Sequence, residues 1–306
     1  MKQALFKNPI LARVTAVVCT LLWGTAFPFI KLGYQAFNIS DSGSVGAKLL
    51  FAGLRFSLAG LMVLLFWALQ KKKTLPIKSE LSMIALLGLV QTFSQYLFTY
   101  IGIGFTGGAN TSVITACASF LTVLAVPFFF KSDRLTWLKI AGCIVGFVGV
   151  LAVNRGGGVT SETLFGDSMI FMSTVCAAAG NVIAKKAALK LNAVKLTAYQ
   201  LLTGGLLLII VGLCCGGTIG FSLNGVLILL WLALVSAVAF ALWTTLLQYH
   251  PASKISIFNL LVPVFGTLLS GVLLGEDVFR IETLISLVLI ALGIILVNIS
   301  RSGKHD

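Results

Sequence analysis

Polar side chains at helical spacing inside a long apolar run are the first residues of this sequence that could do chemistry. Four hydroxyl residues recur at intervals of four and three positions: Thr111, Thr115, Ser119 and Thr122. On a helix this spacing places them on one face. The preceding apolar run carries two amides, Gln91 and Gln95, one turn apart. Hydroxyls and amides donate and accept hydrogen bonds without charge, so the pattern favours reversible binding of a polar ligand.

Other apolar runs add aromatic, glycine and amide residues to this set. Pro28 and Pro263 free the backbone carbonyls of the residues four positions before them, Gly24 and Asn259. The predicted ligand-contacting residues are Trp23, Gly24, Phe27, Gln91, Gln95, Thr111, Thr115, Ser119, Asn181, Trp243, Thr244 and Asn259. Helix packing is the alternative for the small residues, and anchoring at a membrane surface is the alternative for the tryptophans. The glutamines favour ligand binding, because a large amide is costly to bury without a partner.

Arg55 is the one arginine or lysine well inside an apolar run. A charge at that depth indicates either a contact with a charged ligand or a structural role. In the structural role, the guanidinium binds backbone carbonyls or reaches outward to the membrane surface. Both interpretations stay open.

The acids, histidines and cysteines form no reactive or metal-binding pattern. None of the nine acids lies at the middle of an apolar run, and the two histidines are His250 and His305. The motifs HExxH and GxSxG are absent. The sequence therefore predicts no enzyme, no metal and no cofactor. A proton relay or a cationic ligand usually needs a carboxylate or histidine at depth, so a neutral, zwitterionic or anionic ligand is favoured.

Membrane-spanning helices must position these residues, because the chain is 58% apolar and only 10% charged. About 20 apolar residues span a bilayer as a helix. The sequence predicts ten such helices, at 10–30, 49–69, 81–101, 108–130, 135–153, 164–184, 196–215, 226–247, 255–275 and 281–299. The 98 residues that remain leave no room for a soluble ligand-binding or partner domain.

The basic residues predict the orientation of the chain. With the N-terminus inside, 17 of the 22 Lys and Arg residues fall on the inner side. Cytoplasmic loops carry the excess of positive charge in membrane proteins, so both termini are predicted to be cytoplasmic. Binding of nucleic acid would need a clustered basic face on a soluble module, and no such module is present.

The chain also contains an internal repeat. Shifting it by 144 residues places 112–154 on 256–298 without a gap, so that Asp133 meets Asp277 and Gly149 meets Gly293. Two halves follow, 1–153 and 164–306, with five predicted helices each. Because five is odd, the second half enters the membrane from the opposite face. Many secondary transporters use such inverted-topology repeats for alternating access around a midplane site.

Several segments resemble the EamA-like repeat of the drug/metabolite transporter superfamily. In the second half these include WLALVSAVAFALWTTLLQY and ASKISIFNLLVPVFGTLLSGVLLGED, and in the first half LLWGTAFPFIK, the pair Arg55-Phe56 and ANTSVITACASFLTVL. The resemblance implies ten helices in two inverted repeats around a central cavity, and carriage of small metabolites. Two positions depart from the family pattern: Ser119 replaces a common proline, and the segment KSDR replaces a common glutamate.

The sequence thus predicts a multi-pass carrier in the inner or plasma membrane. Its partners are a small-molecule substrate and the lipid bilayer, with the protein a monomer or weak dimer. The favoured substrate is an amino acid or derivative leaving the cytoplasm. The alternative is a vitamin, nucleotide-like metabolite or drug on the same scaffold, and an intramembrane enzyme is a remote alternative. A channel would need a ring of charges or a filter-like loop, neither of which the sequence contains.

Overall fold

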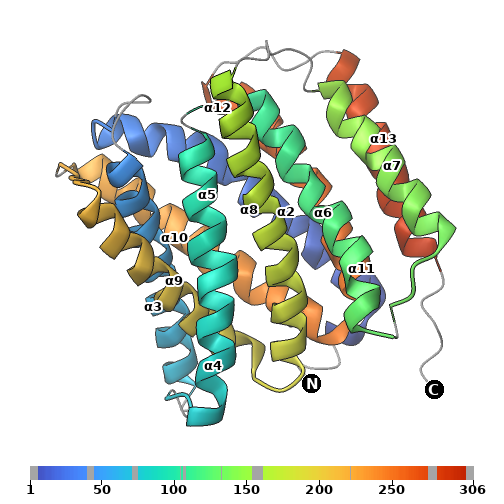
Figure 1. Cartoon of the computed structure of the whole chain (residues 1–306), viewed down its shortest axis with the longest axis horizontal. Helices are drawn as coiled ribbons and strands as arrows, with labels where there is room; N and C mark the ends of the chain where they lie inside the picture. Colours follow the sequence, from blue (N-terminus) through green and yellow to red (C-terminus); the bar gives the residue numbers. More distant parts are fainter. Residues whose placement is uncertain are drawn as a thin grey trace.

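All regular secondary structure in the described part of the chain is helical, as the sequence predicts. The structure, a computed structural model, describes residues 6–39, 45–70, 75–103, 105, 108–131, 133–153, 161–220, 222–274 and 281–300. The helices pack side by side, with α3 and α9 at one edge of the molecule and α7 and α13 at the other (Figure 1).

Seven of the helical rods in the described residues are long and apolar enough to cross a membrane. Five are single helices: α2 (Pro9–Ala36), α3 (Val45–Leu69), α8 (Ser161–Ala188), α9 (Ala193–Cys214) and α10 (Leu223–Tyr249). Two are composite: α4 (Lys78–Leu87), η1 (Gly88–Ser94) and α5 (Gln95–Gly102) form one, and α11 (Ala252–Ser256), η2 (Ile257–Leu260) and α12 (Leu261–Leu274) the other. Shorter apolar stretches lie in α6 (Gly108–Phe129), α7 (Trp137–Val153) and α13 (Ile281–Ile299). The apolar runs predicted from the sequence coincide with these helices.

Asparagine side chains fix where two of the helices begin. Asn8 accepts a hydrogen bond from the backbone N–H of Ile10 at 2.9 Å, and Pro9 occupies the first helical position, where its missing N–H costs nothing. Asn192 caps α9 in the same way, accepting from Val194 at 3.0 Å. These caps separate α2 from the preceding segment and α9 from α8.

Two helices are irregular at amides of the predicted site. Gln91 lies in η1, a π-helical segment between α4 and α5. Asn259 lies in η2, a 3₁₀ segment that leads into α12. Pro263 follows four residues later and has no N–H to donate to the carbonyl of Asn259. Such irregular turns are common at functional positions, because they redirect side chains and backbone groups that a regular helix would fix.

Glycines hold α3 against α9 at close range. Gly46, Gly53 and Gly60 stand seven residues apart on α3, and Gly205 and Gly212 stand seven apart on α9. A Cβ at Gly53 would lie 2.6 Å from a backbone nitrogen of α9, nearer than real Cβ atoms approach. Small residues allow membrane helices to pack backbone to backbone in this way.

The helix contacts of the first half have counterparts in the second half. The α7–α13 pair uses the same device as α3 and α9, since a Cβ at Gly142 would lie 2.7 Å from the carbonyl oxygen of Gly293. In addition, α2 of the first half packs on α10 and α12, whereas α8 of the second half packs on α5 and α6. Each of these contacts joins an element of the first half of the chain to an element of the second half.

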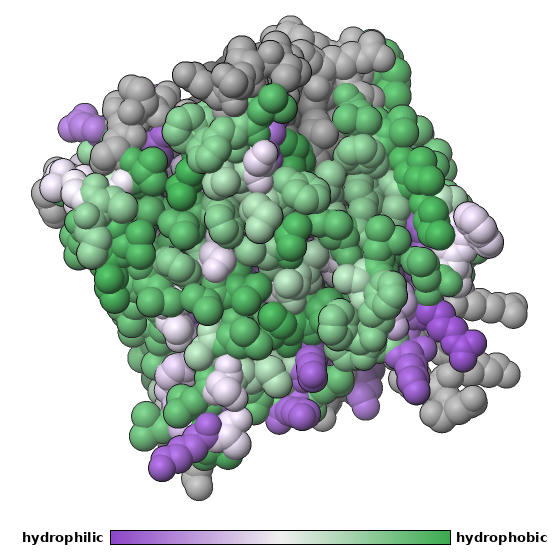
Figure 2. Space-filling model, viewed as in Figure 1, coloured by the Kyte–Doolittle hydropathy of each residue, from purple (hydrophilic) through white to green (hydrophobic). Residues whose placement is uncertain are grey.

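The outer surface carries a broad apolar band. Figure 2 shows this band over the middle of the molecule, with hydrophilic residues gathered along the lower edge. Large apolar side chains such as Leu65, Leu69 and Phe128 are exposed, Phe128 to 87% of its surface. A soluble protein does not expose apolar surface on this scale, whereas hydrocarbon is a favourable environment for it.

Candidate functional site

A buried cluster of aromatic and polar side chains joins four helices in the interior. Trp243 of α10 donates from Nε1 to Oδ1 of Asn181 on α8 at 3.2 Å. Asn181 in turn donates from Nδ2 to the hydroxyl of Thr122 on α6 at 3.3 Å. The ring of Trp23 on α2 packs edge-on against Trp243, with the ring centroids 5.0 Å apart. We call Trp23, Thr122, Asn181 and Trp243 the interior cluster.

Three polar atoms of the predicted site are buried without a hydrogen-bond partner in the described part of the chain. They are Nε1 of Trp23, Oε1 of Gln91 and Oδ1 of Asn259. Leaving a buried donor or acceptor unsatisfied costs about 1–3 kcal/mol, so these atoms are suited to bind a ligand. Other buried atoms in the same condition belong to Ser57, Thr92, Tyr100, Gln200 and Ser256. An unsatisfied atom is therefore evidence for a site only where it adjoins the interior cluster.

Gln91 adjoins the interior cluster through α8. A Cβ at Gly180 would lie 2.7 Å from Cβ of Gln91, so the glutamine side chain packs directly over this glycine. Gly180 precedes Asn181, which belongs to the interior cluster. The chain thus places an amide from η1, an amide from α8 and two indoles within one buried region.

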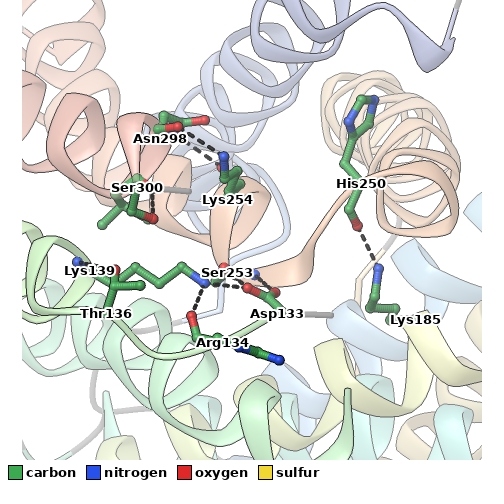
Figure 3. A network of polar contacts seen from close by, with 11 residues as sticks. Asp133, Arg134, Thr136, Lys139, Lys185, His250, Ser253, Lys254, Asn298 and Ser300 are labelled. Atoms are coloured by element: carbon green, nitrogen blue, oxygen red, sulfur yellow. Dashed lines mark hydrogen bonds and ion pairs between the residues drawn. The ribbon is translucent and has the colours of Figure 1, made fainter. Parts of the chain in front are cut away.

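A second polar assembly lies where several helices end, on the side that carries most of the lysines. Asp133, which follows α6, forms an ion pair with Lys139 of α7, and both side chains are buried. Asp133 also accepts hydrogen bonds from the backbone N–H of Ser253 at 3.1 Å and from its hydroxyl at 2.5 Å. Lys139 donates further to the carbonyl of Arg134 at 2.6 Å. Figure 3 shows the contacts of Asp133 with Lys139 and Ser253, through which it joins the end of α6 to the start of α11.

Other lysines tie neighbouring helix ends together on the same side. Lys185 near the end of α8 donates to the carbonyl of His250 at 2.6 Å, beyond the end of α10. Lys254 of α11 donates to the carbonyl of Asn298 on α13 at 3.0 Å (Figure 3). We call Asp133, Lys139, Lys185, Ser253 and Lys254 the helix-end network. Its members cross-link the ends of α6, α7, α8, α10, α11 and α13, where basic residues are concentrated.

A cavity of about 670 Å³ lies between α4, α6 and α8. Its lining is mainly apolar and consists of Ser82, Met83, Leu86, Leu121, Ala125, Phe129, Val175, Ala178, Ala179, Val182, Ile183 and Lys186. None of the predicted ligand-contacting residues is among them. The cavity therefore lies apart from the interior cluster, on the other face of α8, and we call it the lateral groove.

Comparison with protein families decides the identity of the fold. The EamA-like transporter family matches the chain twice, over residues 10–155 and over residues 164–299. The chain belongs to the EamA-like transporter family. The family resemblance drawn from the sequence is thereby confirmed, and so is the drug/metabolite transporter superfamily to which it points.

Relatives of this EamA-like transporter occur in archaea and bacteria. An uncharacterized transporter of Archaeoglobus fulgidus is 25% identical over 286 residues, which cover 93% of this chain and 97% of that protein. YedA, an uncharacterized inner membrane transporter of Escherichia coli K12, is 26% identical over 293 residues, covering 92% and 88%. YyaM, an uncharacterized transporter of Bacillus subtilis, is 28% identical over 301 residues, covering 94% and 93%. These names point to a multi-pass membrane transporter rather than an enzyme.

A solved structure supports the fold of the EamA-like transporter. One crystal structure superposes with a TM-score of 0.77 and covers 94% of this chain and 98% of its own, at 18% sequence identity. The helical arrangement described above is therefore shared by a distant protein.

Several of the predicted ligand-contacting residues of this EamA-like transporter lie in helix contacts. A Cβ at Gly24 would lie 2.6 Å from Cβ of Phe265, so this glycine lets α2 approach α12. The hydroxyl of Ser119 donates to the carbonyl of Ser256 at 3.0 Å and links α6 to α11. Thr244 accepts from the hydroxyl of Thr197 on α9 at 3.0 Å. Each of these three residues contacts a neighbouring helix, as the helix-packing alternative predicts.

The remaining predicted residues are spread over different environments. Thr111 is buried, Gln95 is half-buried and Thr115 is exposed. The side chain of Phe27 lies outside the described part of the structure. The hydroxyl stripe of α6 therefore does not face one space along its whole length, and Thr122, which completes the stripe, is the member that reaches the interior cluster.

Arg55 has a structural partner in the EamA-like transporter. Its Nε donates to the hydroxyl of Ser236 on α10 at 2.9 Å, and its guanidinium lies 5.1 Å from the centroid of the Phe56 ring. The residue is buried and ties α3 to α10. These contacts hold the guanidinium inside the bundle, so Arg55 does not reach outward to the membrane surface.

Sequence reasoning missed the helix-end network. In the sequence Asp133 lies between two apolar runs and indicates no site, and Lys139 and Lys185 count only toward the basic excess that predicts orientation. The available signal was the apolar surroundings of Lys139 and Lys185 (Leu-Lys-Ile and Ala-Lys), since a lysine held among apolar residues requires an acceptor. The acceptors of Lys139 are close in sequence, Asp133 and the carbonyl of Arg134, whereas the acceptor of Lys185 lies beyond the end of α10 and depends on tertiary packing.

Proposed function

We propose that this EamA-like transporter carries a small neutral or zwitterionic metabolite by alternating access, and that an amino acid or derivative leaving the cytoplasm is the substrate. The observation that carries the proposal is the pair of unsatisfied uncharged groups at the interior cluster, Trp23 Nε1 and Gln91 Oε1. A third such group, Asn259 Oδ1, lies in η2, which packs on the two cluster helices α2 and α6. An indole donor and two amide oxygens can bind ammonium, amide and carboxylate groups without imposing a net charge.

An inverted repeat would supply the alternating motion. The two successive matches to the family and the equivalent helix contacts of the two halves both support the division into 1–153 and 164–306. In this proposal ten helices cross the membrane, and α2, α6, α8, α10 and η2 surround the substrate. The interior cluster lies between elements of both halves, the position at which such carriers bind their substrates.

The helix-end network supports the predicted orientation of the chain. Its lysines, together with the ion pair of Lys195 and Glu80 at 2.6 Å, gather at one end of the helices. The excess of positive charge faces the cytoplasm in membrane proteins. We therefore place this end, and with it the start of α2 and the end of α13, on the cytoplasmic side of an inner or plasma membrane.

The paired indoles support a second candidate substrate class. Trp23 contacts both Trp243 and Phe240, with ring centroids 5.0 and 5.3 Å apart. Aromatic rings favour stacked or edge-on partners, so a planar vitamin or nucleotide-like metabolite also fits this region. The same scaffold would carry it.

A binding screen tests the proposal. Purified protein is screened by thermal shift against amino acids, vitamins and nucleotides, because a ligand of the folded state raises its melting temperature. Affinity for the best ligand is then measured for Gln91→Leu and Asn259→Leu. A lost ligand hydrogen bond or a stranded partner costs about 0.5–3 kcal/mol, which weakens binding roughly 3- to 100-fold.

The matched control is Asn298→Leu, which makes the same change at the helix-end network. It removes the amide's hydrogen bond to the carbonyl of Ile294 at 3.0 Å, so it is expected to lower the melting temperature and leave affinity unchanged. If Gln91→Leu and Asn259→Leu behave like this control, the polar residues serve helix packing and the site assignment is wrong.

A further inference from the structure

The lateral groove lies at the outer surface of the molecule, with α4 and α6 as its walls and α8 as its floor. Both α4 and α6 pack on α8, which forms the floor between them. In Figure 1, α8 lies between the α4–α5 rod and α6 on the viewer's side, and Figure 2 shows this side as largely apolar. Leu86, Phe129 and Val175 of the lining are exposed. The groove therefore opens sideways, toward the hydrocarbon that surrounds a membrane transporter.

The length of the groove matches one leaflet of a bilayer. On α8 its lining runs from Val175 to Lys186. Eleven residue steps at about 1.5 Å each give roughly 17 Å. Half of a hydrocarbon core of about 30 Å is about 15 Å. A groove of this length accommodates acyl chains of one leaflet, and its volume lies in the range of about 300–1,000 Å³ common for bound ligands.

The two ends of the groove differ in chemistry. Val175 and Leu121 line the end that lies deeper in the bundle, whereas Ser82 and Lys186 line the end near the helix-end network. Lys186 is exposed and, within the described residues, makes neither an ion pair nor a hydrogen bond through its side chain. Its neighbour Lys185, by contrast, is buried and bound to the carbonyl of His250.

Positive charge surrounds this end of the groove. Each of its three helices has an exposed lysine there: Lys78 at the start of α4, Lys131 just after α6, and Lys186 near the end of α8. The nearby carboxylate of Glu80 is already paired with Lys195. An apolar slot with a cationic mouth complements a molecule that has an anionic head and an apolar tail.

We propose that the lateral groove is a binding site for an anionic phospholipid of the leaflet at the lysine-rich end. An acyl chain lies along α8 between α4 and α6, and the phosphate lies at Lys186 with Ser82 as a hydrogen-bond donor. The lining favours a lipid as the occupant, because most of the wall is apolar and forms few hydrogen bonds with water, and because the opening faces hydrocarbon. This site is distinct from the interior cluster and does not depend on which substrate is carried.

Native mass spectrometry of the purified full-length protein tests the proposal. The protein is titrated with phosphatidylglycerol and with phosphatidylcholine of identical acyl chains. One lysine near an anionic head group contributes about a fivefold preference, so phosphatidylglycerol is expected to bind about fivefold more tightly. Lys186→Gln should abolish this preference and leave the binding of phosphatidylcholine unchanged. Glycerol phosphate, a head group without chains, should not displace the lipid.

A second pair of variants tests the apolar part of the site. Ala179→Phe, on the floor of the groove, should weaken the binding of both lipids, and Val175→Phe should do the same from the deep end. Arg13→Gln and Ala291→Phe make comparable changes on α2 and α13, outside the groove, and should leave both affinities unaltered. Melting temperatures confirm that each variant is folded.

Three results would overturn the lipid site. The first is a preference for phosphatidylglycerol that survives Lys186→Gln. The second is lipid binding that survives both Ala179→Phe and Val175→Phe. The third is displacement by glycerol phosphate alone, which would make the mouth of the groove a phosphate site instead.

Discussion

Replacing Asp133 with Asn should destabilise the protein more than any other single change in the helix-end network. The carboxylate accepts from Lys139, from the backbone N–H of Ser253 at 3.1 Å and from the Ser253 hydroxyl at 2.5 Å. An Asn side chain keeps one acceptor but leaves the cation of Lys139 buried without its counter-charge. Removing one partner of a buried pair typically costs about 3–5 kcal/mol. On the scale of domains of 150–250 residues, this corresponds to a melting temperature lower by roughly 6–20 °C.

Stability should be less sensitive to replacement of Lys139, the other member of the ion pair. Lys139→Met leaves Asp133 with both donors of Ser253, so a smaller loss of stability is expected. In the double variant Asp133→Asn with Lys139→Met neither charge remains, and it should melt above Asp133→Asn alone. Such a rescue measures the coupling between the two residues.

The assay is the melting temperature of the purified protein in detergent, measured for the two single variants and the double variant at one pH and salt concentration. Ser253→Ala removes one hydroxyl donor to the charged carboxylate of Asp133 and should cost about 1.5–3 kcal/mol. If Asp133→Asn melts within about 2 °C of the parent protein, or if the double variant loses the sum of the single losses, the buried ion pair does not hold α6, α7 and α11 together as argued.

Three further outcomes are expected. Gly205→Ala should lower the melting temperature markedly, because the new Cβ would lie 2.6 Å from the backbone nitrogen of Ser57. Gly220→Ala is the control and should have no effect, because no atom lies within 4 Å of the Cβ position at Gly220. Equal melting curves for the two variants would contradict close packing of α3 on α9. In a variant that lacks the exposed native residues Cys214 and Cys215, a cysteine introduced at the exposed position Gly220 should react with an impermeant thiol reagent from outside, and one at Lys190 should not. The opposite labelling would reverse the orientation. Transport in proteoliposomes should persist without a proton gradient when a substrate gradient is supplied, and uptake that acidifies the lumen in fixed proportion to substrate would reveal a proton carrier.

Helix positions could be predicted from the sequence because they depend on local chemistry. A run of about 20 apolar residues is enough to specify a membrane helix, and the described helices coincide with the predicted runs. Even the irregular segment at η2 has a local cause, since Pro263 removes a backbone donor. The π-helical turn at η1 has no such signal around Gln91, and the structure shows it next to a close contact between Gly88 and α9.

The candidate site could be predicted only in part, because periodicity gives the face of a helix but not its neighbour. Thr122 and Ser119 both belong to the hydroxyl stripe of α6, yet Thr122 meets Asn181 of α8 whereas Ser119 meets the backbone of α11. One face of a helix in a bundle contacts two or three other helices, so residues on the same stripe can have different roles. Which role each takes depends on the register between helices.

The sequence also does not predict the helix-end network, because its pattern identifies the residues of the network but not the residues that they contact. The shift of 144 residues aligns Asp133 with Asp277, which makes the two acids look equivalent. Asp277 lies outside the described residues, and the equivalence of the two acids is one of sequence alone. It does not extend to the partner of Asp133 at the start of α11, because the same shift carries Ser253 onto Ala109, which has no hydroxyl to donate. A repeat therefore predicts where an element recurs. Whether a contact recurs depends on both of its residues, and at this position one of them differs. The hydroxyl that Asp133 binds therefore has no counterpart under this shift, and the two halves of the sequence are not chemically interchangeable at this position.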